Sequence, residues 1–403
     1  MSEILVLTSS ETGGDLYVTM AVALGLSQRG HSVRFVGDEG VTRVAGLQGI
    51  EATALPPELQ VARRMVRASR QSKGAPARKR GELLRNTLLE WAREVAPAVE
   101  NIVQQAHPDL LLTSLGVAPV GENIAGGSTI PWVVVSGTFY VGPNAPRPLE
   151  EDFSAGMVPV FESIRSSLDA ASLVIHGTWP AFDFSRVELP SRHRYVGPLF
   201  WEAPGTPPQY LTEPGDPWVL ATLSSMTHDD IPLGQTILDA LADRAVRVLL
   251  TTGANRDMRF LLRTPPNARI EPYVPHSAVL QRSDLFVSYG GTGAVMKALW
   301  FGVPMVLVPW GGIDRPGVAA RAERLGAARV IQPTDLTPAI LADAVECVLA
   351  EDQYRAAARA VARELQASDP VALACTHIEG LLVGAPLPAP HARARSVEAQ
   401  SPD

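Results

Sequence analysis

The sequence is poor in cysteine, in aromatic residues and in net positive charge. Two cysteines occur in 403 residues, Cys347 and Cys375, and because their spacing does not suit a metal site we interpret them as reduced packing residues. Aromatic residues make up 6% of the chain and do not alternate with a basic stripe, which argues against a platform for single-stranded nucleic acid. The formal net charge of -7 gives no general attraction to nucleic acid or to an anionic membrane, so phosphate binding would have to be local.

Long hydrophobic runs are also missing. The apolar run Ile4–Thr8 has the length of a strand and follows Glu3, so it does not have the pattern of a secretory signal. The most apolar later stretch, Ala294–Trp310, is interrupted by a lysine, a glycine and a proline, and it suits a helix followed by a strand better than a membrane span. We therefore expect a cytoplasmic protein without stable membrane insertion.

Short apolar segments that alternate with helix-like segments run through the chain. Strand Ile4–Thr8, the glycine turn Thr12–Asp15, helix Leu16–Gln28 and strand Val33–Val36 are typical of the opening of a βαβ unit. Further strands are expected at Leu110–Thr113, Trp132–Ser136, Leu173–His176, Trp218–Leu223, Val246–Thr251, Leu285–Ser288 and Met305–Val308, with helices from about Ile231, Thr292 and Pro316. This alternation predicts the α/β class with parallel sheets.

A segment rich in proline and glycine, Gly197–Pro217, divides the chain. With 403 residues, 46% of them hydrophobic, the chain can build two cores. We expect an N-terminal Rossmann-like domain at residues 1–202, a linker at 203–217, a C-terminal Rossmann-like domain at 218–382 and a disordered tail at 383–403 that is rich in proline and alanine.

The segment between Pro56 and Arg93 is basic and poor in strand-forming residues. It contains the run VARRMVRASRQSKGAPARKRGELLR. One interpretation is a solvated helical excursion. The other is a lid over a substrate, or a membrane-facing patch, because clustered arginine and lysine side chains suit either role.

The run VSYGGTGAVMKALWFGVPMVLVPWGGIDRP, Val287–Pro316, predicts a strand, a glycine turn, a helix, a strand and an acidic loop. The backbone N–H groups of Gly290–Gly293 and the start of the helix at Thr292 would face an anionic ligand such as a diphosphate. The alternative is an ordinary tight turn between a strand and a helix.

Four segments together resemble the nucleotide-sugar glycosyltransferases of the GT-B fold, in particular the bacterial natural-product branch and its sterol-glucosyltransferase relatives. They are TGGDLYVTMAVALGLSQRGHSVRF, YVGPLFW, EPYVPHSAVLQRSDLFVSYGG and GVPMVLVPWGGIDRPGVAARAERLG. The resemblance covers roughly residues 3 to 382. It implies an α/β protein of two Rossmann-like domains whose parallel sheets face each other across a cleft.

The resemblance also implies an activity. We expect an inverting, metal-independent transfer of a sugar from a UDP- or dTDP-sugar to a small lipophilic natural product, with no further cofactor. The N-terminal domain would bind the acceptor, through loops such as Leu55–Glu90 and Ser136–Pro148, and the C-terminal domain would bind the nucleotide-sugar. No nucleic-acid partner is expected, and homodimer formation is left open.

Asp15 is the candidate catalytic base. Members of the family use a histidine or an aspartate in the first glycine turn, and this chain has no histidine before His31. An ordinary aspartate, with a pKa near ~3.9, is a weak base that works as charge develops on the acceptor. The alternative is that Asp15 caps the helix. Gly14 and Phe139 are expected to contact the acceptor.

The resemblance implies a donor site around the second glycine turn. We expect Tyr273 to stack on the nucleobase and Asp314 to bind sugar hydroxyls. The full set of expected donor contacts is Ser224, Ser225, Tyr273, Val274, His276, Tyr289, Gly290, Gly291, Thr292, Gly293, Asp314 and Arg315. The other histidines have no metal-ligand spacing, so no metal ion is expected.

Several donor positions depart from the family pattern. The usual phosphate-binding histidine is Tyr289, the usual ribose-binding acid is Lys297, and the glutamine of an Asp-Gln pair is Arg315. The glycine of a serine-rich turn is Ser224, and an early proline is Thr19. An unusual donor would explain these changes, and so would a non-catalytic or repurposed GT-B scaffold. A sugar-nucleotide epimerase or hydrolase is a third hypothesis, for which no additional acid–base motif is present.

Overall fold

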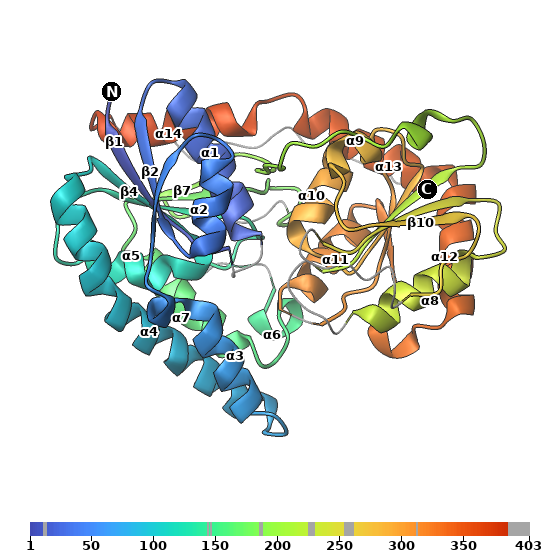
Figure 1. Ribbon diagram of the computed structural model, residues 1–403, viewed down its shortest axis with the longest axis horizontal. Coiled ribbons are helices and arrows are strands. Elements are labelled where there is room, and N and C mark those ends of the chain that lie inside the picture. Colours follow the sequence, from blue (N-terminus) through green and yellow to red (C-terminus); the bar gives the residue numbers. More distant parts are fainter. Residues whose placement is uncertain are drawn as a thin grey trace, which may run out of the picture.

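The computed structural model describes residues 1–10, 14–142, 145, 147–184, 188–224, 230–253, 262–311 and 313–385. Two α/β lobes stand side by side, the N-terminal one coloured blue to green and the C-terminal one mostly yellow to orange (Figure 1). The predicted contact residue Ser225, the turn residues Thr12 and Gly13, and the tail from residue 386 lie outside the described residues.

The N-terminal lobe is built on a parallel sheet that has seven strands in the described part of the chain, in the order β3-β2-β1-β4-β5-β6-β7. The strands are β1 (Glu3–Leu7), β2 (Ser32–Gly37), β3 (Glu51–Ala54), β4 (Leu110–Ser114), β5 (Trp132–Ser136), β6 (Leu173–His176) and β7 (His193–Tyr195). Strands β4, β5 and β6 are buried along their whole length, because helices cover both faces of a parallel sheet.

The helices of this lobe are α1 (Asp15–Gln28), α2 (Glu39–Gly46), α3 (Val61–Gln71), α4 (Ala77–Ala106), α5 (Ala118–Ala125), α6 (Leu149–Asp152) and α7 (Val158–Leu168). The basic segment forms α3 and the first turns of α4, a helical hairpin that projects from the lobe at the bottom of Figure 1. The predicted helical excursion is therefore confirmed, whereas a role for it stays a prediction.

The C-terminal lobe repeats the architecture, with six parallel strands among the described residues in the order β10-β9-β8-β11-β12-β13. They are β8 (Trp218–Thr222), β9 (Arg247–Thr251), β10 (Ala268–Glu271), β11 (Leu285–Ser288), β12 (Met305–Leu307) and β13 (Ala328–Val330). The helices after β8 are α8 (Ile231–Leu241), α9 (His276–Leu280), α10 (Thr292–Trp300), α11 (Arg315–Arg324), α12 (Pro338–Ala350), α13 (Asp352–Leu365) and α14 (Pro370–Leu382). Two parallel-sheet domains confirm the expected fold class.

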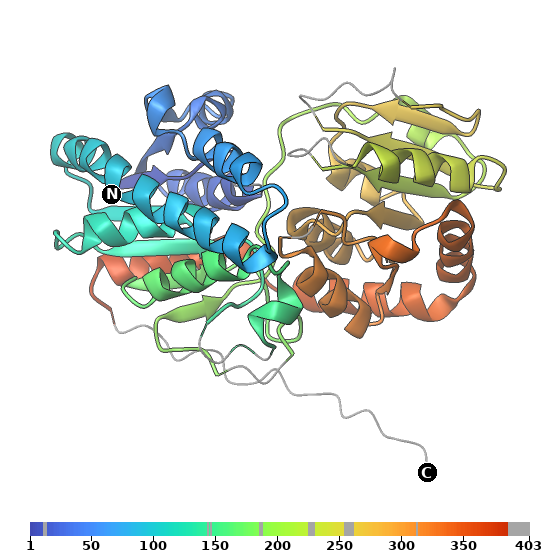
Figure 2. The same cartoon turned by 90° about the horizontal axis from the view of Figure 1, so that it is seen from below.

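The last helix, α14, returns to the N-terminal lobe (Figures 1 and 2). Its residues Ala374, Cys375 and Ile378 are fully buried in one hydrophobic cluster with residues of β1 and α1. Gly25 of α1 allows this approach, because a Cβ there would lie 2.8 Å from the Cys375 sulfur. The sequence-based boundary at residue 382 therefore does not follow the packing, since α14 covers the N-terminal sheet.

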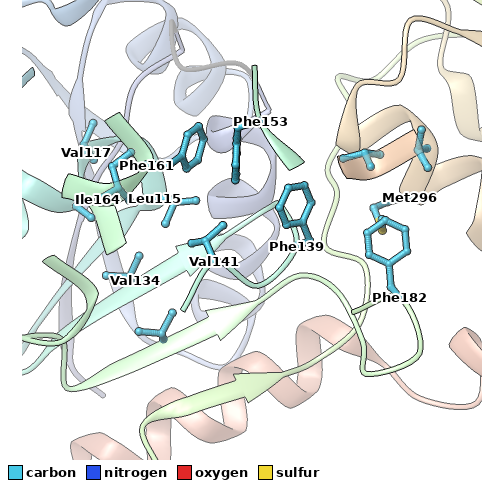
Figure 3. Packing of buried hydrophobic residues seen from close by; sticks show 14 of the residues in the cluster. Leu115, Val117, Val134, Phe139, Val141, Phe153, Phe161, Ile164, Phe182 and Met296 are labelled. Atoms are coloured by element: carbon cyan, nitrogen blue, oxygen red, sulfur yellow. The ribbon is translucent and has the colours of Figure 1, made fainter. Parts of the chain in front are cut away.

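The two lobes also share a hydrophobic core. Phe139 and Phe182 of the N-terminal lobe belong to the same buried cluster as Met296 of α10 (Figure 3). Val318 of α11 belongs to it as well. A buried ion cluster adds to this contact. Arg321 of α11 is 0% exposed and lies within salt-bridge distance of Asp152 and Asp183, which are 1% and 0% exposed.

Candidate active site

The strand order reverses once in each sheet, between β1 and β4 and between β8 and β11. Open α/β sheets bind ligands outside the carboxyl ends of their strands at such a reversal. Asp15 and Gly116 follow β1 and β4, while Ser224 and the turn Gly290–Gly293 follow β8 and β11. Asp15, Ser224 and the glycine turn, which the sequence singles out, thus lie at the two reversal points.

Asp15 is the first residue of α1, and Gly14 occupies the N-cap position without a side-chain cap. The capping alternative for Asp15 is therefore wrong. Its half-buried carboxylate reaches across the reversal point, where Oδ2 accepts a hydrogen bond of 2.8 Å from the Gly116 N–H. A carboxylate in the first turn is also favoured by the helix dipole. The contact fixes the carboxylate between the ends of β1 and β4.

The second glycine turn leads directly into α10. Gly290 has φ 85°, a conformation that favours glycine, and Gly291 is the N-cap of the helix. A Cβ on Gly291 would lie 2.5 Å from the Tyr289 hydroxyl oxygen, so glycine permits the ring to lie over the turn. The first backbone N–H groups of a helix have no partner inside it, which makes this turn suitable for an anion.

Asp314 is held by hydroxyl groups from both lobes. Its Oδ2 accepts hydrogen bonds of 2.8 Å from Thr138 Oγ1, which follows β5, and of 2.8 Å from Thr292 Oγ1, the first residue of α10. The neighbouring Ile313 has φ 63° and exchanges two hydrogen bonds with Ser154 of the N-terminal lobe. The loop before α11 is therefore tied to the N-terminal lobe at two consecutive residues.

Arg315 points inward. It is 5% exposed, its guanidinium lies 4.5 Å from the centre of the Tyr289 ring, and Nη1 donates to the Trp310 carbonyl. Burial raises the pKa of the Tyr289 phenol, so the hydroxyl keeps its proton near neutral pH and can donate a hydrogen bond. In this structure Arg315 supports the Tyr289 ring; contact of either residue with a donor stays a prediction.

Lys297 forms a shielded ion pair with Glu202, which precedes the linker. The Lys297 Nζ atom lies 2.6 Å from Glu202 Oε1, and both side chains are 14% exposed. Glu202 Oε2 accepts a further hydrogen bond of 3.1 Å from the Ser277 N–H. Although burial opposes ionisation of Glu202, the ammonium and the Ser277 N–H hold its carboxyl pKa below the ordinary value. Lys297, which stands where the family pattern has an acid, is thus neutralised by Glu202 from another segment.

The predicted nucleobase contacts lie beside this ion pair. Tyr273 is 38% exposed and its hydroxyl donates to the Ala203 carbonyl at 2.6 Å, whereas Val274 is 4% exposed. His276 Nε2 lies 3.0 Å from Thr251 Oγ1. Burial lowers the pKa of His276 to about 4, so its imidazole is neutral near pH 7. Of these three residues, Tyr273 is the one whose hydroxyl is held by a hydrogen bond while its aromatic ring is partly exposed.

The remaining predicted residues divide between exposed and buried positions. Gly14 is exposed, and Ser224 is 1% exposed, with its N–H bonded to Asp230. Phe139 is 0% exposed and packs 3.8 Å from the Arg321 guanidinium, so it serves the contact between the lobes. Its contact with an acceptor stays a prediction.

Sequence reasoning missed Thr138, Gly116 and Glu202. Each joins a predicted residue through a contact between distant segments, and only the position of Thr138 and Gly116 directly after predicted strands could have pointed to them. Among the described residues no group of three or more histidine, cysteine or acidic side chains is placed to hold a metal ion. No described helix is both long and apolar enough to span a membrane.

Known proteins resemble this chain over different lengths. Residues 235–378 match the family "Erythromycin biosynthesis protein CIII-like, C-terminal domain". The chain is 35% identical to 4'-demethylrebeccamycin synthase of Lentzea aerocolonigenes over 226 residues, which are 55% of this chain and 52% of that enzyme. It is 25% identical to demethyllactenocin mycarosyltransferase of Streptomyces fradiae over 92% of this chain and 84% of that enzyme.

Solved structures share the whole architecture. The calicheamicin glycosyltransferase CalG4 superposes with a TM-score of 0.75 at 22% identity, covering 95% of this chain and 98% of CalG4. The chain has the two-domain GT-B fold of this glycosyltransferase. The spinosyn rhamnosyltransferase SpnG, solved with thymidine diphosphate, has a TM-score of 0.70 at 19% identity, covering 93% of this chain and 99% of SpnG. The structural similarity thus extends over both domains of the chain.

Proposed function

We propose that this protein is an inverting, metal-independent glycosyltransferase that moves a sugar from a nucleoside diphosphate to a small lipophilic natural product. The observation that carries the proposal is the placement of Asp15 at the reversal point of one sheet and the Gly290–Gly293 turn at that of the other. A proton acceptor and an anion-binding helix start are thereby assigned to separate lobes, as a two-substrate transfer requires.

The chemistry follows from these positions. The acceptor hydroxyl attacks the anomeric carbon while Asp15 takes its proton, and the Gly116 N–H keeps the Asp15 carboxylate oriented. As the bond between the acceptor oxygen and the anomeric carbon forms, the bond from that carbon to the phosphate oxygen breaks. The electron pair leaves with the nucleoside diphosphate, whose charge is stabilised by the N–H groups at the start of α10.

The same helix start allows the reaction to run without a metal ion or another cofactor in our proposal. Asp314, already anchored by two threonine hydroxyls, would bind sugar hydroxyls with its remaining acceptor positions. A UDP- or dTDP-sugar is the expected donor, and the thymidine diphosphate bound to SpnG supports the second of these. SpnG has also been solved with the spinosyn aglycone, which supports a natural-product acceptor.

A thermal-shift screen against UDP, dTDP and their sugars, with and without EDTA, tests the donor part. A ligand at ~100-fold above its Kd stabilises the folded state by roughly 2.7 kcal/mol. A protein that responds to none of these nucleotides, or responds only with added metal, would contradict the proposal. Product analysis with a panel of aglycones then tests transfer, and the anomeric configuration of the product tests inversion.

The second candidate is a non-catalytic GT-B scaffold. The buried orientation of Arg315 and the Lys297–Glu202 ion pair favour it, because both take a charged side chain away from a donor. It predicts nucleotide-independent function that Asp15→Asn leaves intact. Donor-dependent product that disappears in this variant would exclude it.

A further inference from the structure

The hairpin of α3 and α4 concentrates positive charge in an acidic protein. Residues 61–85, which we call the basic hairpin, contain nine arginine or lysine residues and one acidic residue, Glu82. Their formal charge is +8, against -7 for the whole chain, so the rest of the molecule is strongly acidic. Charge segregated in this way creates a local positive field that the net charge conceals.

Much of this charge is unpaired. Arg64 and Arg78 form ion pairs, with Glu94 at 2.7 Å and Glu82 at 3.3 Å. Within the part of the chain that the structure describes, the exposed side chains of Arg67, Arg70, Lys73 and Lys79 form no salt bridge. Four exposed like charges in one hairpin repel one another, so hairpin stability does not explain them.

Apolar side chains are exposed beside these cations. Val66 is 48% exposed and Leu83 is 37% exposed. Val66 lies one helical turn from Arg70 on α3, and Leu83 one turn from Lys79 on α4, so each apolar side chain shares a helix face with an unpaired cation. Cations beside apolar side chains on an exposed helix are typical of helices that lie at a lipid interface.

The hairpin is also accessible. Its tip forms the lowest part of the N-terminal lobe in Figure 1 and extends below the sheets of both lobes. Its inner face is fixed by packing, since Ala68 of α3 and Leu84 and Leu88 of α4 are buried in the shared hydrophobic core. A rigid, projecting surface of this kind can approach a flat partner without rearrangement of the domain.

We propose that the basic hairpin docks this protein reversibly on an anionic lipid bilayer. Phosphate-bearing headgroups would neutralise the four unpaired cations, while Val66 and Leu83 enter the boundary between headgroups and acyl chains. Nucleic acid fits the surface less well, because residues 61–85 contain no aromatic side chain for stacking and expose two apolar ones. This binding goes beyond the proposed sugar transfer and does not depend on it.

Sedimentation of the full chain with lipid vesicles tests the proposal. We expect binding to phosphatidylcholine vesicles that contain phosphatidylglycerol, no binding to phosphatidylcholine alone, and weaker binding as salt is raised. A variant that combines Arg67→Gln, Arg70→Gln, Lys73→Gln and Lys79→Gln should bind at least about 100-fold more weakly, since each cation near an anionic surface contributes about fivefold. Val66→Ser with Leu83→Ser should weaken binding while the salt dependence remains.

The matched control removes four exposed arginines from the C-terminal lobe: Arg263→Gln, Arg282→Gln, Arg359→Gln and Arg363→Gln. It should bind vesicles like the unaltered protein, and circular dichroism should show that all variants are folded. Equal binding by the hairpin variant and the control, or no binding to anionic vesicles, would overturn the proposal. Tighter binding to a DNA or RNA duplex than to vesicles would assign the surface to nucleic acid instead.

Discussion

Replacement of Arg321 by methionine should strongly destabilise the contact between the lobes. The Arg321 guanidinium bonds Asp152 through two nitrogens at 2.8 Å and 2.9 Å, and bonds Asp183 at 3.1 Å. All three side chains are at most 1% exposed, so Arg321→Met takes the bound guanidinium from both carboxylates, and among the described residues only Asp152 keeps another salt-bridge partner, Arg147, at 3.3 Å. Breaking a buried ion pair from one side costs about 3–5 kcal/mol, and loss of the arginine from the Phe139 ring adds to this.

Urea unfolding followed by tryptophan fluorescence and circular dichroism measures this cost. Arg363→Met, an exposed arginine on α13, is the matched control and should change the unfolding free energy by less than about 0.5 kcal/mol. Adding Asp183→Asn to Arg321→Met should recover part of the loss, because the salt bridge of Asp183 is to Arg321 and the substitution removes the charge left behind. A loss below about 1 kcal/mol for Arg321→Met, equal to that of the control, would refute the role of the ion cluster.

The cost should also depend on pH. Burial raises the pKa of Asp183, while Arg321 opposes that rise. Without Arg321 the pKa rises further, so the folded state gains a proton at higher pH than the unfolded chain does. A raised pKa gives stability that is present at low pH and is lost as pH increases. The difference between Arg321→Met and the unaltered protein should therefore shrink as the pH is lowered from neutrality, and a constant difference would show that the Asp183 carboxylate is not its cause.

Three further predictions concern the site and the N-terminal core. Asp15→Asn should lower the rate of sugar transfer by at least about 100-fold while nucleotide binding persists, and full activity would exclude Asp15 as the base. Thr138→Val should lower the unfolding free energy by about 1.5–3 kcal/mol through its bond to Asp314, and Thr138→Ser, which keeps the hydroxyl, should not. Burial lowers the pKa of His193 to about 4 from 6.5, and that of its partner His176 as well. The free energy of unfolding should therefore decrease as the pH is lowered from 6.5 to about 4. Each histidine can change the unfolding free energy by up to about 1.4 kcal/mol per pH unit. Urea unfolding of His193→Gln should show a weaker dependence of this free energy on pH, and an unchanged dependence would contradict the prediction.

The central strands could be predicted because a parallel strand that is covered on both faces is an apolar run. Trp132–Ser136 and Leu285–Ser288 match β5 and β11 residue for residue. The edge strand β3 has the sequence EATA and β13 has ARV, and neither carries that signal, so the prediction missed both. β10, at the other edge of the C-terminal sheet, was missed for the same reason.

Contacts between the lobes were beyond prediction. Thr138 and Asp314 lie 176 residues apart, and Lys297 lies 95 residues from Glu202. No local periodicity records such a pairing, so Lys297 could be recognised as a departure from the family but not as half of an ion pair. The glycine turn, by contrast, is a local feature, and its position before α10 followed from the spacing of its glycines.

The return of α14 makes the N-terminal lobe discontinuous in the chain. During synthesis, β1 and α1 emerge first, but the helix that covers them with Ala374, Cys375 and Ile378 emerges only after the whole C-terminal lobe. Gly197 and Pro370, at the two crossings between the lobes, lie side by side, with 3.2 Å between a Cβ on Gly197 and the proline ring. Exchange of the C-terminal lobe between proteins of this fold therefore needs two junctions, one at each crossing, so that α14 stays with the α1 against which it packs.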